Sequence, residues 1–193
     1  MTEPQARVID VRVGSATDGR APISVVERSL SAGAFHWLGL VSVALAALIA
    51  DQLTKQIVAS QLALGESVHV AGPLSIHHVK NTGIAFGLFG GLAGPVTILT
   101  AIAILWMVGY FAKAGAQHPI LPVALGLLIG GSVSNLADRI RLGHVRDFLD
   151  FEYWPAFNLA DSFICIGVGV LLVALVAAER RPRAPRSAPK ASA

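Results

Sequence analysis

Residues 92–112 read LAGPVTILTAIAILWMVGYFA, a run of 21 positions without a charged side chain. A helix of this length is about 31 Å long, enough to cross the hydrocarbon core of a bilayer. A lone strand would leave its backbone groups unpaired in lipid, so the stretch predicts a transmembrane helix. This single segment already places the chain among integral membrane proteins.

Three further stretches of the same kind lie on either side of it, and the predicted spans cover residues 33–55, 92–112, 119–138 and 157–178. The composition agrees, because 54% of the 193 residues are hydrophobic and only 14% are charged. A soluble domain of this size could not bury so much apolar surface. Low charge argues against disorder, and a single cysteine excludes a disulfide scaffold. The predicted fold class is an α-helical integral membrane protein with four transmembrane helices.

Polar tails flank this membrane domain. Residues 1–32 are predicted to form a polar tail without regular structure, residues 33–178 the membrane domain, and residues 179–193 a basic tail rich in Pro and Ala. With four spans, both tails and the turn at 113–118 share one side, and ten of the fifteen Lys and Arg residues lie there. The positive-inside rule therefore predicts that both termini are cytoplasmic. The basic residues suit anionic membrane lipids, and a net charge of only +3 predicts no nucleic-acid partner.

Two segments remain for the opposite, extracytoplasmic side. Residues 59–91 contain an apolar alternation at Val68 and Val70, and again near Leu74 and Ile76. That period predicts short strands, and thus a small β-rich cap over the membrane domain. Residues 138–156 are dense in charges and aromatic side chains, and their Tyr and Trp fit the aromatic belt of a membrane interface. We interpret the run from Asp150 to Trp154 as a solvated interfacial loop.

Polar side chains also occur within or at the ends of the spans, where an ionised group costs about 2.5–3.5 kcal/mol at the bilayer centre. Such residues are by default functional, and here they are Asp51, Lys55, Asn135, Asp138, Asn158 and Asp161. Asn135 and Asp138 are three residues apart, as are Asn158 and Asp161, so each pair shares a helical face. The predicted topology brings four carboxylates to one membrane boundary: Asp51, Asp138, Asp147 and Asp161.

Two neighbouring carboxylates that share a proton can act as base and acid toward a water molecule, as in aspartic peptidases. From the residues alone, any two of the four acids could form this pair. Asn135 or Asn158 could orient a neighbouring carboxylate, and Arg139 could keep a structural one charged. Asp51 and Lys55 could instead be an i,i+4 ion pair with a purely structural role.

Five motifs, in this order, resemble the lipoprotein signal peptidase family, also called signal peptidase II. They are Asp-Gln-Leu-Thr-Lys at 51–55, Asn-Thr-Gly-Ile-Ala-Phe-Gly at 81–87, Gly-Gly-Ser-Val-Ser-Asn-Leu-Ala-Asp-Arg at 130–139, Gly-His-Val-Arg-Asp-Phe at 143–148 and Phe-Asn-Leu-Ala-Asp-Ser at 157–162. The resemblance covers residues 50–172 and leaves out both tails. One departure is Arg146, because the family commonly has an apolar residue before the aspartate of the fourth motif.

The resemblance implies a membrane aspartyl endopeptidase that removes the signal peptide from diacylglyceryl-modified prolipoproteins by cutting before the lipidated cysteine. It implies that Asp147 and Asp161 are catalytic and that no cofactor is needed. The positions implied to bind substrate or support the site are Asp51, Lys55, Asn81, Gly83, Asn135, Asp138, Arg139, Asn158 and Ala160. Of these, Asn81, Asn135, Arg139 and Asn158 are expected to line the substrate channel. Arg146, as a neighbouring cation, could lower the pKa of Asp147 unless its side chain points to the lipid headgroups, and the sequence leaves this open.

Other functions remain open at this point. A proton- or ion-coupled transporter also uses intramembrane aspartates, but a relay needs acids throughout the membrane depth, whereas these cluster at one edge. A non-catalytic scaffold would tolerate the loss of Asp161. No metal site is predicted, because His77, His78 and His144 lack the usual ligand spacing. The resemblance implies a protein of the bacterial plasma membrane with an extracytoplasmic active site, and the oligomeric state is left unknown.

Overall fold

The computed structural model describes residues 8–10, 24–26, 32–83, 93–115 and 118–179. Within these ranges lie four long helices, α1 (Ala34–Gln61), α2 (Ala93–Ala114), α3 (Leu121–Leu142) and α4 (Leu159–Glu179). Each contains a segment long and apolar enough to cross a membrane. The prediction of four transmembrane helices is confirmed.

Two helices are longer than the predicted spans. α1 runs to Gln61 and α3 to Leu142, past the ends predicted at residues 55 and 138. Hydropathy marks the thickness of the lipid, whereas a helix continues until its backbone is interrupted. For α3 the interruption is Gly143, whose φ of 75° lies in the left-handed region that favours glycine at a helix C-terminus.

α3 is the central helix of the bundle and packs against the other three. Its apolar segment is 67% buried, compared with 17% or less in each of the others. Small residues allow the close approach, since a Cβ added at Gly130 would collide with the backbone of Ala44 in α1. A Cβ added at Gly131 would meet the carbonyl of Ala160 in α4. Packing of this kind, with small residues at the contact, is typical of membrane helices.

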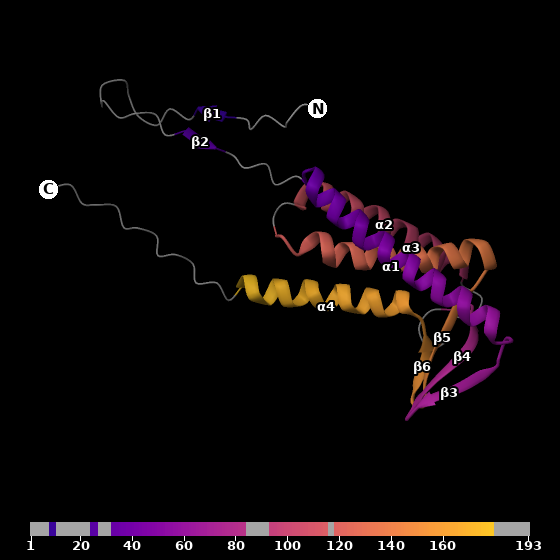
Figure 1. The fold of residues 1–193 in the computed structure, drawn as a ribbon. Helices are drawn as coiled ribbons and strands as arrows, with labels where there is room; N and C mark the ends of the chain where they lie inside the picture. Colours follow the sequence, from indigo (N-terminus) through magenta and orange to yellow (C-terminus); the bar gives the residue numbers. More distant parts are fainter. Residues whose placement is uncertain (1–7, 11–23, 27–31, 84–92, 116–117, 180–193) are drawn as a thin grey trace, which may run out of the picture.

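The cap is a four-stranded antiparallel sheet, with strands β3 (Ser67–Ala71), β4 (Leu74–Asn81), β5 (Val145–Phe151) and β6 (Trp154–Phe157) in the order β3-β4-β5-β6. It lies at one end of the bundle, where α1 and α3 end and α4 begins (Figure 1). The strands predicted within residues 59–91 are present. No strand was predicted within residues 138–156, which hold the end of α3, β5 and most of β6. Of the run from Asp150 to Trp154, interpreted as a loop, only Glu152 and Tyr153 form a turn between the two strands.

β5 carries two adjacent charged residues of the site, Arg146 and Asp147. It pairs with β4, with Arg146 opposite Lys80 and Asp147 opposite Val79. Because side chains alternate along a strand, Arg146 and Asp147 point to opposite faces of the sheet. The strand therefore directs Asp147 to the cavity described below and Arg146 to the neighbouring Asp138 of α3.

The N-terminal stretch contains a second, two-stranded sheet. β1 (Val8–Asp10) pairs antiparallel with β2 (Ser24–Val26), and both strands are rich in β-branched residues. This differs from the prediction of a tail without regular structure over residues 1–32. The remaining positions up to residue 31, and residues 180–193 of the basic tail, lie outside the described part of the chain.

Candidate active site

The four predicted aspartates do converge at the sheet end of the bundle, but in two separate groups. Asp147 from β5 and Asp161 from the first turn of α4 line one cavity. Asp51 from α1 and Asp138 from α3 are buried beside it, with exposures of 0% and 1%. Neither of the latter two is among the residues that line the cavity.

Asp147 is held by two asparagine side chains. The Asn81 Nδ2 donates to Asp147 Oδ2 at 2.9 Å, and the Asn158 Nδ2 donates to Asp147 Oδ1 at 2.7 Å. The Gly83 N–H donates to the other end of the Asn81 amide at 3.0 Å, which fixes the orientation of that side chain. Asp147 is only 2% exposed, so its carboxyl group lies in a fixed, nearly dry position.

Asp161 is held in a similar way at the start of α4. Its Oδ1 accepts from Asn135 Nδ2 at 2.8 Å and its Oδ2 from the Asn158 backbone N–H at 3.2 Å. The Asp161 N–H in turn donates to the Asn158 Oδ1 at 3.0 Å, the pattern of a helix N-cap. One side chain, Asn158, is thus hydrogen-bonded to both aspartates and fixes their relative position.

The cavity that the two carboxylates share has a volume of about 680 Å³. Three of the four residues predicted to line a substrate channel do line it: Asn81, Asn135 and Arg139. The fourth, Asn158, is fully buried and holds Asp147 instead. The lining residues that were not predicted come from α2 (Val96, Thr100), α3 (Ser132), β5 (Val145), β6 (Trp154, Pro155, Ala156, Phe157) and α4 (Ser162, Ile164, Cys165, Ile166).

A cluster of two acids and two cations lies beside the cavity, with three members buried and Arg146 partly buried. Lys55 Nζ lies 2.7 Å from Asp51 Oδ2 and 3.4 Å from Asp138 Oδ2. Arg146 Nη2 donates to Asp138 Oδ1 at 2.8 Å, and the Arg146 Nε donates to Asp138 Oδ2 at 3.2 Å. The predicted Asp51–Lys55 ion pair is present, but it belongs to this neutral four-charge cluster.

The cluster is joined to the two cavity aspartates by hydrogen bonds. Lys55 Nζ donates to Asn135 Oδ1 at 2.8 Å, and the amide of the same Asn135 contacts Asp161. Asp51 Oδ1 accepts from the Ala160 N–H at 2.9 Å, which ties the first turn of α4 to α1. Among the described residues, no buried side-chain nitrogen or oxygen lacks a partner. The supporting residues therefore act as one connected scaffold.

The contacts of Asp138 and Asp51 within this scaffold differ from those expected from the sequence. The guanidinium that holds Asp138 belongs to Arg146, not to the adjacent Arg139. Gln52 and Ser134, which sequence reasoning missed, complete the cluster: Gln52 Nε2 donates to Asp138 Oδ1 at 3.0 Å, and Ser134 Oγ donates to Asp51 Oδ2 at 2.6 Å. Gln52 lies three residues before Lys55, so the helical spacing was a signal that could have identified it.

The sequence left open whether Arg146 lowers the pKa of Asp147, and the structure shows that it does not. Arg146 points away from Asp147, toward Asp138, so its charge is engaged elsewhere. Burial of the carboxyl group raises the pKa of Asp147 from 3.8 to about 6, against the opposing effect of the Asn81 hydrogen bond. The negative charge of Asp161 raises it further. The period-two alternation of a strand would have placed Arg146 correctly, had β5 been predicted.

We expect this raised pKa to appear as a loss of stability between about pH 4 and pH 6. In that window the folded state keeps a proton on Asp147 that the unfolded state releases, so the free energy of unfolding falls as pH rises. The total change is on the order of 3 kcal/mol. Thermal midpoints measured in detergent at steps from pH 4 to 7 test this, with Asp147→Asn as the comparison.

The Asp147→Asn variant should show a shallower decline than the parent across this window, because the group that titrates there is gone. Glu152→Gln, which removes an exposed acid from the turn between β5 and β6, should keep the slope of the parent. Equal slopes for the parent and Asp147→Asn would contradict the assignment.

Among the residues that the structure describes, no group of three or more His, Cys, Asp or Glu side chains is arranged to hold a metal ion. The chemistry that the cavity itself supports is that of two carboxyl groups close enough to interact electrostatically. Arg139 lines the same cavity and adds a positive charge near both of them.

Known proteins resemble this chain over most of its length. The family model described as Signal peptidase (SPase) II matches residues 43–177. A lipoprotein signal peptidase of Symbiobacterium thermophilum is 40% identical over 143 residues, covering 72% of this chain and 94% of that protein. One from Pelotomaculum thermopropionicum is 44% identical over 133 residues, covering 67% of this chain and 86% of that protein.

Solved structures agree with these sequence matches. A bacterial membrane enzyme determined by the in meso method at 2.3 Å resolution superposes with a TM-score of 0.70 at 31% identity, covering 76% of this chain and 94% of that one. A second, at 1.9 Å resolution, gives a TM-score of 0.65 at 34% identity, covering 71% and 92%. None of these matches supports the alternative of a transporter. Because the matched region takes in all four helices from residue 43 onward and both cavity carboxylates, the chain belongs to the signal peptidase II family of membrane peptidases.

Proposed function

We propose that Asp147 and Asp161 are the catalytic pair with which this peptidase cuts diacylglyceryl-modified prolipoproteins just before the lipidated cysteine. The observation that carries the proposal is the division of the four buried aspartates. Asp147 and Asp161 share a cavity and one bridging residue, Asn158, whereas Asp51 and Asp138 are each engaged with a buried cation. The first pair is thus available for proton transfer, and the second pair serves the scaffold.

The proposed reaction needs only these two carboxyl groups and water. The pair holds one proton at the start: the ionised carboxylate removes a proton from water, and the resulting hydroxide attacks the carbonyl carbon before the lipidated cysteine. The protonated partner hydrogen-bonds the carbonyl oxygen as it becomes negative. Collapse of the tetrahedral intermediate breaks the C–N bond, and the amine leaves with a proton from the pair. The two pKa values belong to the pair as a unit.

Fixed geometry is what the surrounding residues contribute. Asn81 and Asn158 each occupy one oxygen of Asp147, and Asn135 occupies one oxygen of Asp161. Groups held in this way need little reorganisation when charge develops in the transition state. No cofactor is required in this scheme, because the carboxyl pair and water supply base, acid and nucleophile.

We further infer that the cavity faces the extracytoplasmic side. α1 begins and α4 ends at the end of the bundle opposite the sheet (Figure 1). Ten of the fifteen Lys and Arg residues precede α1 in the sequence, follow α4 or, in the case of Lys113, lie in the last turn of α2, and such residues favour the cytoplasm. Substrate then enters sideways from the outer leaflet, with its acyl chains still in the lipid.

The proposal is tested by incubating the purified protein in detergent micelles with a diacylglyceryl prolipoprotein and with the same precursor lacking the lipid. We expect cleavage of the lipidated precursor alone, with mass spectrometry placing the cut immediately before the modified cysteine. Equal cleavage of both precursors would contradict the lipid requirement. No cleavage of either by the folded protein would refute the proposed peptidase reaction.

A further inference from the structure

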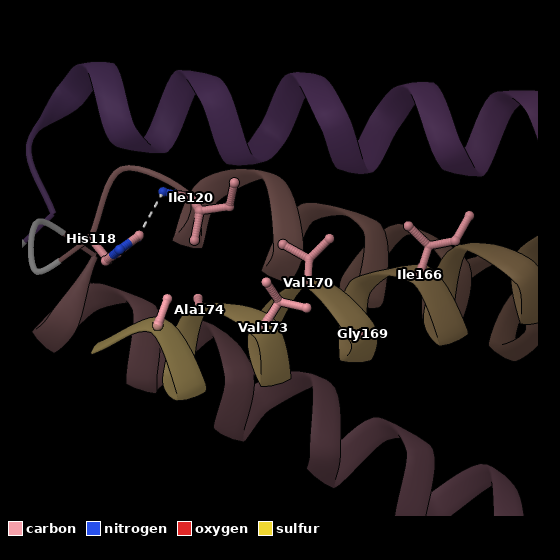
Figure 2. Close-up of a pocket in the computed structure, with 8 residues that line it drawn as sticks. His118, Ile120, Ile166, Gly169, Val170, Val173 and Ala174 are labelled. Atoms are coloured by element: carbon pink, nitrogen blue, oxygen red, sulfur yellow. Dashed lines mark hydrogen bonds between the residues drawn. The ribbon is translucent and has the colours of Figure 1, made fainter. Parts of the chain in front are cut away.

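A second cavity, of about 540 Å³, runs along the membrane face of α4. Figure 2 shows the α4 residues that line it, Ile166, Gly169, Val170, Val173 and Ala174, with His118 and Ile120, which lie just before α3, at one end. Ala177 extends the lining on α4. Positions 166, 169, 170, 173, 174 and 177 follow helical spacing, so they form one stripe on α4. We call this feature the α4 groove.

The α4 groove continues the catalytic cavity. Ile166 lines both of them, and Ser162 and Cys165, which lie one turn earlier on the same helical face, line the catalytic cavity. Free space is present along the stripe, since a Cβ added at Gly169 would meet no atom within 4 Å. An apolar segment that leaves the catalytic cavity toward the far end of α4 therefore meets a matching, open apolar surface.

We propose that the α4 groove binds the hydrophobic segment of the substrate's signal peptide. This rests on the proposed function, because the scissile bond must lie at Asp147 and Asp161. The residues before the bond belong to the signal peptide, and their hydrophobic segment must run from the site toward the cytoplasmic face. Asp161 stands at the start of α4 and the groove ends at Ala177, which is the same direction.

The length of α4 along the groove matches the length of the hydrophobic segment of a signal peptide. From Asp161 to Ala177, α4 advances about 24 Å, at 1.5 Å per residue. A signal peptide has a hydrophobic segment of about 7–15 residues, which covers roughly 10–22 Å as a helix. The acyl chains of the lipidated cysteine lie in the outer leaflet, which is about 15 Å thick, or half of the 30 Å hydrocarbon core. They therefore do not reach the far end of the groove.

The experiment uses two lipidated substrates with the same residues around the cut, one with the complete signal peptide and one without its hydrophobic segment. The protein is compared with Gly169→Phe, which fills the groove. The matched control is Gly109→Phe in α2, where an added Cβ also meets no atom within 4 Å. For Gly169→Phe we expect KM for the complete substrate to rise about tenfold with kcat unchanged, as for loss of ground-state binding.

The shortened substrate should be cut equally well by the parent, Gly169→Phe and Gly109→Phe. The proposal is overturned if Gly169→Phe leaves KM for the complete substrate unchanged, or if it impairs both substrates alike. In either case the proposed function stands as long as the parent cleaves. Failure of the parent to cleave either substrate would instead refute the proposed function.

A crosslinking readout identifies the occupant directly. A photoreactive residue in the middle of the hydrophobic segment should crosslink to the stretch between Ile166 and Ala177, identified by mass spectrometry. Crosslinks confined to α2, or to lipid only, would overturn the proposal. A crosslink between two copies through α4 in the absence of substrate would overturn it too, because the groove would then be a subunit interface.

Discussion

Replacing Asp147 or Asp161 by Asn is expected to lower the rate of signal peptide cleavage by about 10³-fold or more. Asparagine keeps the size of the side chain but can neither accept the proton from water nor donate one to the leaving amine. The fold should survive, because Asp147 meets only neutral amide donors and Asp161 meets an amide and a backbone N–H. The measurement is kcat/KM on a diacylglyceryl prolipoprotein, with a thermal melt of each variant.

Asp138→Asn provides the internal comparison. Asp138 is as deeply buried as Asp147, but its oxygens contact Arg146 and Gln52 and do not line the cavity. We expect this variant to lose stability and yet keep measurable turnover in the fraction that is folded. If Asp138→Asn is folded and inactive while one of the two cavity variants retains full activity, the choice of catalytic pair is wrong.

Replacing Lys55 by Met is expected to cause the largest loss of stability, about 3–5 kcal/mol, which is typical when one partner of a buried ion pair is removed. Lys55 is 1% exposed and contacts Asp51, Asp138 and Asn135. Without it, the buried cluster carries a net negative charge. For a chain of this size, the thermal midpoint should fall by on the order of 10 °C.

A second substitution separates charge from packing. Lys55→Met combined with Asp51→Asn restores a neutral cluster, so the double variant should regain part of the lost stability. Lys80→Met, which removes an exposed lysine from β4, is the matched control and should leave the thermal midpoint nearly unchanged. Equal stability of the single and double variants would contradict the view that charge balance in this cluster governs stability.

Local features of the sequence were sufficient for the helical part of the fold. The four spans follow from apolar runs of about 20 residues, because lipid imposes both helix and length on such a run. The Asp51–Lys55 pair follows from i,i+4 spacing within one helix. Helix ends were less well predicted, because Gln61 and Leu142 lie beyond the apolar runs and nothing in their hydropathy marks a helix end.

β5 illustrates what local sequence could not show. Residues 145–151 carry an Arg and two Asp, so the segment does not stand out as a strand until it pairs with β4, more than 60 residues earlier in the chain. The partner of Asp138 was missed for the same reason. Arg139 is adjacent in sequence, but the backbone of β5 brings Arg146 to it instead.

The sequence by itself determined the membrane location, the number of spans and the candidate acids, because lipid penalises every polar group in its core and the exceptions are therefore conspicuous. Only the tertiary structure decided how those acids divide. Asp51 and Asp138 are neutralised by Lys55 and Arg146, whereas Asp147 and Asp161 meet neutral amide groups and a cavity. The protonation of a carboxyl group depends on its burial and on charges within a few ångströms, and both are properties of three-dimensional packing.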